Sequence, residues 1–235
     1  MNRLGFAENE IPALIAYLSS TSSFLIQSVF SHLAASEDPA SDPFTFQQFS
    51  IYQTVTNQLS NQLNCSFLKH IANSAAALRH PSFSMDMVRV GIGLYGVESS
   101  IIQSVQPAIT LRSTIAQVKK VSAGSSISYN RKTMLDSDAI IATVRLGYAD
   151  GYPRRLGNGV GQVMVRGKRA PIVGTICMDM FMIDVTAIDD VREGDEVILF
   201  GKELPVHEVS KWAGTIPYEI LTGISQRVKR VYFQE

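Results

Sequence analysis

The apolar pattern of this sequence changes near residue 100, and the change restricts the folds that the chain can adopt. Before it, segments with helical spacing alternate with short apolar runs. After it, apolar runs follow one another closely, separated by turns rich in Gly, Asp and Pro. Alternating helices and strands favour a parallel sheet, whereas closely spaced strands favour an antiparallel β domain. The sequence therefore predicts an α/β domain followed by a mainly β domain, with residues 1–103 in the first and residues 104–235 in the second.

Individual elements can be placed from the same pattern. In the first domain helices are expected at 10–20, 44–62 and 73–79, and strands at 24–32, 66–70 and 85–96. In the second domain strands are expected at 108–121, 137–147, 161–167, 169–186, 195–201 and 230–235, with short helices at 206–214 and 217–228.

Composition excludes several classes of protein. A hydrophobic content of 46% and a net charge of zero are those of an ordinary globular chain. No apolar run is long enough to span a membrane, and the first residues lack the order of a secretory signal, so we expect a cytoplasmic protein that does not contact membranes. Lys and Arg are scattered, which predicts no nucleic-acid partner. Cys65 and Cys177 lack metal-ligand spacing, so we expect buried thiols, no disulfide and no metal.

Candidate functional residues follow the strands predicted in the first domain. His32, residues 70–74 and residues 89–92 lie where strands give way to loops, the usual place for functional groups in βα architectures. Asn73 or Ser74 begins a predicted helix, whose free N–H groups either carry an ordinary cap or hold a phosphate. The glycines of "RVGIG" would let backbone N–H groups approach a ligand.

Two stretches of the second domain are unusual for simple turns. In "IIATVRLGYADGYPRRLG" an apolar strand stops at Tyr148, although a turn needs only the glycines and the proline. In "GTICMDMFMID" the carboxylate of Asp179 lies between methionines, which is costly unless the group is paired or exposed. We therefore expect a cation or a ligand next to Asp179.

Taken in order, the motifs resemble those of the alanine racemases, pyridoxal phosphate enzymes of fold type III. The matching stretches run along the whole chain: "MNRLGF", "FSHLAASED", "HIANSAAALR", "DMVRVGIGLYG", "RLGYADGYPRRL", "PIVGTICMDMFMIDVT" and "YEILTGISQRVKR". The resemblance implies a (β/α)8 TIM-like barrel, of which residues 1–103 are the second half, followed by an antiparallel β domain. It places Met1 inside the family's "DTGMxRLG" segment, so the first half of the barrel and the lysine that binds the cofactor are expected outside this chain.

The resemblance also implies catalytic roles. Tyr148 corresponds to one of the two bases that exchange the α-proton of alanine, acting on the cofactor of the opposite subunit in a head-to-tail homodimer. Because a phenol ordinarily titrates near about 10, such a base needs cationic or hydrogen-bonding neighbours. His32 and Arg89 correspond to these neighbours: the tyrosine bonds the histidine, the histidine bonds the arginine, and the arginine faces the pyridine nitrogen of the cofactor.

Binding roles follow in the same way. Arg3 and the backbone N–H of Met178 correspond to groups that hold the substrate carboxylate, and Asp179 corresponds to a residue that faces the cofactor-binding lysine. The cofactor phosphate would be held by a set that this resemblance identifies as Ser74, Gly91, Ile92 and Gln226. Gln226 departs from the family, which has a tyrosine at this position in "SYRVPR". A second departure is "SYN" at 128–130, where the family usually has "SYG".

The implied function is racemisation of L-alanine and D-alanine for cell-wall precursors. Two alternatives stay open at this point: a non-catalytic dimerisation or regulatory fragment, and a related racemase for another small amino acid. The ending "ISQRVKRVYFQE" also resembles racemases fused behind a cell-wall peptide ligase, so a longer upstream chain is expected. A half barrel leaves a strand edge and an apolar face open, which predicts oligomers or low solubility of the isolated chain.

Overall fold

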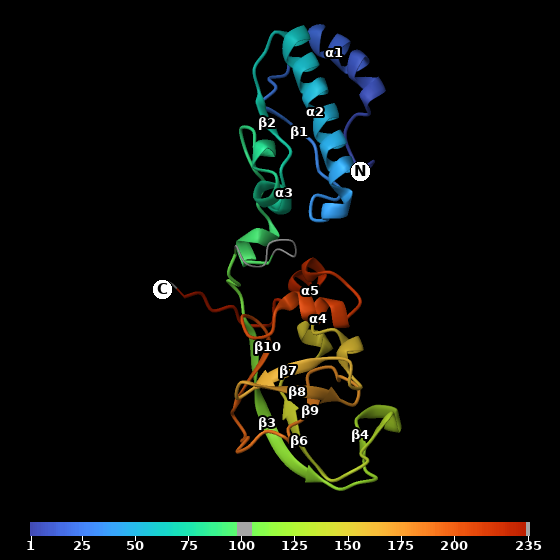
Figure 1. Cartoon of the computed structure of the whole chain (residues 1–235), viewed down its shortest axis with the longest axis vertical. Helices are drawn as coiled ribbons and strands as arrows, with labels where there is room; N and C mark the ends of the chain where they lie inside the picture. The colour runs from blue at the N-terminus through green and yellow to red at the C-terminus, as the bar shows by residue number, and fades with distance from the viewer. Residues whose placement is uncertain (98–104, 234–235) are drawn as a thin grey trace. The chain divides into compact units, whose positions relative to one another are not determined.

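The computed structural model of the chain describes residues 1–97 and 105–233 (Figure 1). The chain divides into two compact units, Met1–Val105 and Gln106–Glu235. The domain boundary expected at 103/104 lies outside the described residues. Each unit has its own buried hydrophobic residues.

Unit 1 contains the three helices that the sequence predicts and two of its three predicted strands. Strands β1 (Ser28–Phe30) and β2 (Leu68–His70) form a two-stranded parallel sheet in which Phe30 pairs with His70. The helices are α1 (Ile11–Ser19), α2 (Asp42–Leu63) and α3 (Ser74–Arg79), with shorter 3-10 turns at Glu8–Glu10, Pro39–Ser41, Pro81–Phe83 and Ile92–Tyr95. Figure 1 shows α1 and α2 packed along one another beside this sheet.

The limits of α2 follow from local backbone chemistry. Pro43 lies in its first turn, where the missing N–H of proline leaves no hydrogen bond unmade. Asn64 ends the helix in the left-handed conformation at φ 47°, which asparagine tolerates better than most residues. Between these limits Tyr52 is buried against Leu33 and Phe83, and its hydroxyl donates to the carbonyl of Val29 at 2.7 Å. Helix α2 therefore fixes the position of strand β1.

The strand predicted at 85–96 is wrong. Only two backbone bonds join this segment to the end of β2 and the loop after it: Asp86 N–H donates to the Lys69 carbonyl and Arg89 N–H to the Ala72 carbonyl. The segment then turns into the 3-10 helix Ile92–Tyr95, because Gly91 and Gly93 leave the extended conformation to meet Ser74. The apolar run is therefore an irregular extended segment that ends in a turn.

Unit 2 is built around a closed antiparallel β barrel, which confirms the predicted antiparallel β domain. The strand order is β10-β3-β6-β9-β8-β7, and the last strand of this series closes onto the first. The barrel strands are β3 (Leu111–Val121), β6 (Ala139–Val144), β7 (Gln162–Val165), β8 (Lys168–Val173), β9 (Phe181–Asp184) and β10 (Glu196–Phe200). A hairpin of β4 (Ser126–Ile127) and β5 (Thr133–Met134) interrupts the barrel series, and α4 (Val206–Trp212) and α5 (Pro217–Gly223) lie at one end of the barrel (Figure 1).

Two strand predictions in unit 2 need correction. The run 169–186 is not one strand but β8 and β9, joined by a turn at 174–180. Residues 230–233 form no strand among the described residues, and residues 234–235 lie outside them. The physical reason is barrel closure: β10 already pairs with both β3 and β7, so the barrel has no free edge for a further strand.

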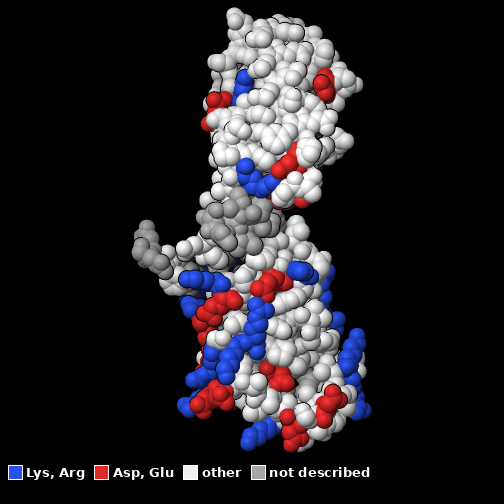
Figure 2. Space-filling model, in the orientation of Figure 1, with Lys and Arg blue, Asp and Glu red and all other residues white. Residues whose placement is uncertain are grey.

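Surface features differ between the two units. Figure 2 shows few charged side chains on unit 1 in this view, whereas Lys and Arg alternate with Asp and Glu on unit 2. Cys65 and Cys177 are free thiols that are partly exposed, so their predicted burial is wrong; Cys177 lies in the turn between β8 and β9 rather than in a strand. None of the helices that the structure describes is long and apolar enough to cross a membrane.

Candidate functional site

In unit 1 the guanidinium of Arg89 lies at the carboxyl ends of the two parallel strands. It donates to the carbonyl of Ser31 at 2.7 Å, just after β1. It also donates to the carbonyls of His70 and Ile71, at 3.1 and 3.3 Å, at the end of β2. The ring of Phe30 lies 5.3 Å from its central carbon. Arg89 thus holds the ends of both strands together and is itself fixed in place.

Two histidines flank this arginine, as the strand-end pattern predicts for His32. One terminal nitrogen of Arg89 lies 2.7 Å from Nδ1 of His70, and the other lies 3.4 Å from Nδ1 of His32. Because arginine is always a donor, both Nδ1 atoms accept, and the imidazole protons lie on Nε2. Burial, and then the charge of Arg89, lower the pKa of both histidines below 6.5. The two rings are therefore neutral near pH 7, each with an N–H that faces away from Arg89.

This arrangement predicts that acid destabilises unit 1. Because the folded-state pKa values of His32 and His70 lie below their unfolded value, the unfolded chain binds more protons in this range. The contribution of both rings to the free energy of unfolding is complete above about pH 6.5 and decreases as the pH falls below it. We expect the urea concentration at the midpoint of unfolding to decrease as the pH is lowered from about 7.5 to about 5.5. The decrease should be smaller in His70→Gln, because the glutamine amide does not titrate and its oxygen can still accept from Arg89. An unchanged pH dependence in His70→Gln, followed by circular dichroism, would contradict this.

The start of helix α3 resolves the choice that the sequence left open between Asn73 and Ser74. Asn73 is the cap, because its side-chain oxygen accepts from the N–H of Ala76 at 3.0 Å. Ser74 is thereby released, and its hydroxyl oxygen accepts from the N–H groups of Gly91 and Gly93, at 2.9 and 3.3 Å. The structure thus brings together Ser74, Gly91 and Ile92, three of the residues expected to bind a phosphate. The N–H of Ile92 has no acceptor among the described residues.

Arg3 lies in the exposed first residues of unit 1. Its charge contributes to the lowered pKa of His32, after burial and the charge of Arg89. No hydrogen bond or ion pair holds Arg3 among the described residues. Unit 1 therefore combines a fixed cation, Arg89, and two neutral imidazoles at one end of its sheet, and the charge of Arg3 also acts on His32.

In unit 2 the turn after β6 presents the phenol of Tyr148, which is 43% exposed. The turn is fixed by the backbone of the turn between β8 and β9: Tyr148 N–H donates to the Cys177 carbonyl at 3.1 Å, and Ala149 N–H donates to the Met178 carbonyl at 2.8 Å. A Cβ at Gly147 would overlap the Met178 backbone and lie 2.5 Å from the nitrogen of Asp179. Glycine is required here because two backbone segments touch, which brings Tyr148, Met178 and Asp179 together.

The setting of Asp179 differs from the expectation. Asp179 is exposed, and so are Met178 and Met180 on either side of it. No cation pairs with its carboxylate among the described residues, and none is needed, because an exposed carboxylate is solvated by water. The "CMDM" run forms a turn and not a buried strand, so of the two expected neighbours, a cation or a ligand, only the ligand stays a prediction for Asp179. The backbone N–H of Met178 has no acceptor in the described part of the chain.

The segment that carries Gln226 lies against the Tyr148 turn. Ser225 N–H donates to the Asp150 carbonyl at 2.9 Å, and Arg227 forms an ion pair with the Asp150 carboxylate at 2.9 Å. Gln226 lies between them with an exposed side chain. The role of Asp150 was not predicted from the sequence; the available signal was an acidic residue inside a glycine-flanked turn, which is also what an ordinary surface turn contains.

The "SYN" departure has a backbone explanation. Asn130 adopts the left-handed conformation, with φ 61° and ψ 13°. Glycine enters this region freely, and asparagine is among the few other residues that do so at low cost. Asn130 can therefore replace the usual glycine without a change in the path of the chain.

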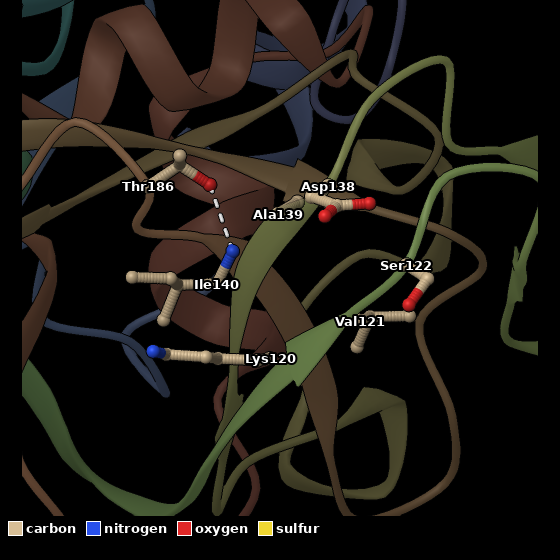
Figure 3. Close-up of a pocket in the computed structure, with 7 residues that line it drawn as sticks. All are labelled: Lys120, Val121, Ser122, Asp138, Ala139, Ile140 and Thr186. Atoms are coloured by element: carbon tan, nitrogen blue, oxygen red, sulfur yellow. Dashed lines mark hydrogen bonds between the residues drawn. The ribbon is translucent and has the colours of Figure 1, made fainter.

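A small pocket lies at the opposite end of β6 from Tyr148 (Figure 3). Its volume is about 160 Å³, and Ile140 N–H donates to the Thr186 hydroxyl on its wall. It is lined by Lys120, Val121, Ser122, Asp138, Ala139, Ile140 and Thr186. None of the predicted site residues lines this pocket, so it is separate from the candidate residues described above.

Comparison with known proteins identifies the family of the chain. The family model described as "Alanine racemase, C-terminal domain" matches residues 108–232, and the one described as "Alanine racemase, N-terminal domain" matches residues 1–99. The chain belongs to the alanine racemase family. The matched domains agree with the observed order of an α/β unit followed by a β domain.

Relatives support the assignment along the whole chain. The alanine racemases of Desulforamulus reducens and Halothermothrix orenii are 42% and 41% identical and cover 99% of this chain. Among solved structures, alanine racemase from Bartonella henselae with covalently bound pyridoxal phosphate gives a TM-score of 0.89 at 34% identity over 99% of the chain. The enzyme from the D-cycloserine producer Streptomyces lavendulae gives 0.91 at 32% over 100%. The chain spans only 63% to 64% of the length of these four alanine racemases.

Proposed function

We propose that this chain forms the larger part of a pyridoxal phosphate-dependent racemase that interconverts L-alanine and D-alanine. The observation that carries the proposal is the exposed phenol of Tyr148, held by backbone bonds beside Met178. A racemase needs a base that is accessible to substrate yet fixed in orientation. The named relatives, which are called alanine racemases, support alanine as the substrate.

The residues of unit 1 fit the proposed cofactor. Because the Ser74 oxygen accepts from two N–H groups, its own O–H is available to donate to a phosphate oxygen. The N–H of Ile92 is also available, and nothing lies within 4 Å of the position where a Cβ at Gly91 would be. These groups form a small set of donors with open space beside them, which suits a phosphate.

Arg89 fits the pyridine ring of the same cofactor. Its two terminal nitrogens are used by carbonyls and imidazoles, whereas its Nε has no partner among the described residues and could donate to a ring nitrogen. An arginine keeps its own proton and therefore leaves the ring nitrogen largely unprotonated. Pyridoxal phosphate, when bound, supplies stabilisation of the charge that remains after the α-proton leaves.

Within this proposal the other residues bind substrate and move the proton. Arg3 and the Met178 N–H would hold the substrate carboxylate, and Tyr148 would be one of two bases, exchanging the α-proton on one face of the substrate while the second base acts on the opposite face. The neutral imidazole of His32 would donate from Nε2 to the phenolate oxygen, while Arg89 fixes its orientation. In this scheme Gln226 would donate its amide to the phosphate, and Asp179 would face the lysine that anchors the cofactor.

Several finer features belong to the same proposal. We propose a head-to-tail homodimer, in which Tyr148 of one protomer serves the cofactor held by the other. Unit 1 would be the second half of a (β/α)8 barrel, because its parallel sheet and βα order match that architecture. The product D-alanine would enter cell-wall precursors in the cytoplasm.

A second candidate is an assembly module without catalysis. It is favoured by the exposed face of the parallel sheet, where the side chains of Phe30 and Leu68 are 64% and 51% exposed. Parallel sheets are normally covered on both faces, so this surface is suited to contact another polypeptide. Cofactor binding separates the two candidates, since an assembly module has no need of it.

Titration with pyridoxal phosphate, followed by its visible absorbance and by thermal unfolding of the protein, tests the proposal. We expect saturable binding and a raised melting temperature, because a ligand that binds only the folded state stabilises it. Ser74→Ala should weaken binding by about tenfold, the typical effect of losing one hydrogen bond to a charged group, whereas Ser84→Ala serves as the matched control. Absence of any saturable change in the unaltered chain would contradict the proposed cofactor and favour the assembly module.

A further inference from the structure

A single carboxylate, that of Asp150, joins the Tyr148 turn to the last described segment of the chain. One of its oxygens accepts from the N–H of Gly147 at 2.9 Å, which closes the turn around Tyr148. The other accepts from Nε of Arg227 at 2.9 Å. The side chain of Asp150 is only 12% exposed, whereas that of Arg227 is 57% exposed. The pair therefore lies at the edge of the buried region, with both carboxylate oxygens used.

Backbone contacts reinforce the same junction. Ser225 N–H donates to the Asp150 carbonyl at 2.9 Å. A Cβ on Gly151 would lie 2.6 Å from the carbonyl carbon of Gly223, so the two chain segments touch directly. Arg230 in turn donates to the carbonyls of Ile224 and Ser225 and stiffens this segment from its other side. The end of α5 and the Tyr148 turn thus pack directly against each other.

The far end of the turn is anchored in the barrel core. Tyr152 is fully buried and stacks on Phe181 with ring centres 5.5 Å apart, and its N–H donates to the Gly147 carbonyl. The position of the turn along the barrel is therefore set by Tyr152, while its contact with residues 224–228 depends on Asp150. Tyr148 lies two residues before Asp150, and Gln226 lies one residue before Arg227. The contact between Asp150 and residues 224–228 therefore sets the positions of Tyr148 and Gln226 relative to each other.

We propose that Asp150 and Arg227 are positioning residues that hold the phenol of Tyr148 in line with the segment bearing Gln226. The inference deepens the proposed racemase function and rests on it for its catalytic consequence. A partly buried, charge-assisted hydrogen bond holds geometry more firmly than the exposed ion pairs of unit 2, such as that of Arg112 with Glu196. Loss of the Arg227 side chain leaves the Gly147 bond and the Ser225–Asp150 backbone bond intact but removes the side-chain link between the Asp150 carboxylate and residues 224–228.

The kinetic test measures deuterium uptake at the α-carbon of L-alanine with pyridoxal phosphate present. Arg227→Met should lower the rate at saturating alanine by about ten to a hundredfold, with little change in the alanine concentration for half-maximal rate, because a small misplacement of a base acts on the chemical step. Arg227→Lys, which can still reach Asp150, should recover part of the rate. Arg166→Met, which breaks an ion pair with Asp195 elsewhere on the barrel, is the matched control and should leave the rate unchanged.

Two further measurements separate positioning from simple loss of stability. In a Tyr148→Phe background, Arg227→Met should have no additional effect on exchange; an equal loss in both backgrounds would overturn the proposal. In chain labelled with 13C-tyrosine, the Tyr148 ring signal, assigned from Tyr148→Phe, should shift in Arg227→Met and not in Arg166→Met. If the unaltered chain shows no exchange, the proposed racemase function of this chain fails. The positioning role is then decided by the ring signal alone, and an unmoved signal would overturn it.

Discussion

Replacement of Tyr148 by phenylalanine is expected to lower deuterium uptake at the α-carbon of L-alanine by about 10² to 10⁴-fold in the presence of pyridoxal phosphate. This is the usual range for loss of a positioned acid or base. The substitution removes only the hydroxyl, and the backbone bonds that hold the turn involve N–H groups of residues 148 and 149, which phenylalanine keeps. The fold should therefore be unchanged, and the loss should lie in the rate of proton exchange. The measurement is mass spectrometry of alanine after incubation in heavy water.

Tyr17→Phe is a suitable control for this experiment, since Tyr17 is also exposed, at 58%, and belongs to α1. It should exchange protons at the rate of the unaltered chain. Cofactor without protein sets the background rate. A Tyr148→Phe variant as active as the unaltered chain would remove Tyr148 from the mechanism and leave the exposed phenol without a role.

The sequence predicts elements well where one periodicity dominates. Helix α2 was expected at 44–62 and runs from Asp42 to Leu63, because its apolar face, its proline and its terminal asparagine all favour the same limits. The run 85–96 was misassigned because its apolar residues resemble a strand, whereas its glycines are drawn into hydrogen bonds with Ser74. That interaction joins residues 17 and 19 positions apart, and no local pattern contains it.

The candidate site shows the same difference between features that a local pattern contains and features that depend on contacts distant in sequence. The rule that loops after strands carry functional groups selected His32 and His70, and the structure brings both next to Arg89, although the strand expected to carry Arg89 does not form. The role of Asp150 could not be predicted, because its partner Arg227 is distant in sequence and the two meet only when α5 packs against the turn. The exposure of Asp179 was not predictable for the same reason, since it depends on the path of the turn between β8 and β9 and not on the local sequence.

Substitution of Gly151 by alanine is expected to cost about 4 kcal/mol of unfolding free energy in unit 2. Gly151 has φ +94°, a conformation in which an L side chain costs about 1 to 3 kcal/mol. The added methyl would also lie 2.6 Å from the Gly223 carbonyl carbon and 2.8 Å from the Ile224 Cα, and such overpacking costs about 1 to 3 kcal/mol more. Both contacts are with backbone, which cannot rotate away. The measurement is the urea midpoint followed by circular dichroism.

Gly159→Ala separates the two contributions to this loss. Gly159 has nearly the same backbone angle, φ +84°, but a Cβ there would meet nothing within 4 Å. Its substitution should cost only the conformational part, about 1 kcal/mol. Equal losses of unfolding free energy in the two variants would mean that the backbone between the Tyr148 turn and α5 moves to accommodate the methyl group at little cost. A larger loss in Gly151→Ala, together with slower proton exchange in the part that stays folded, would show that the close contact of residues 151 and 223 holds the phenol in place.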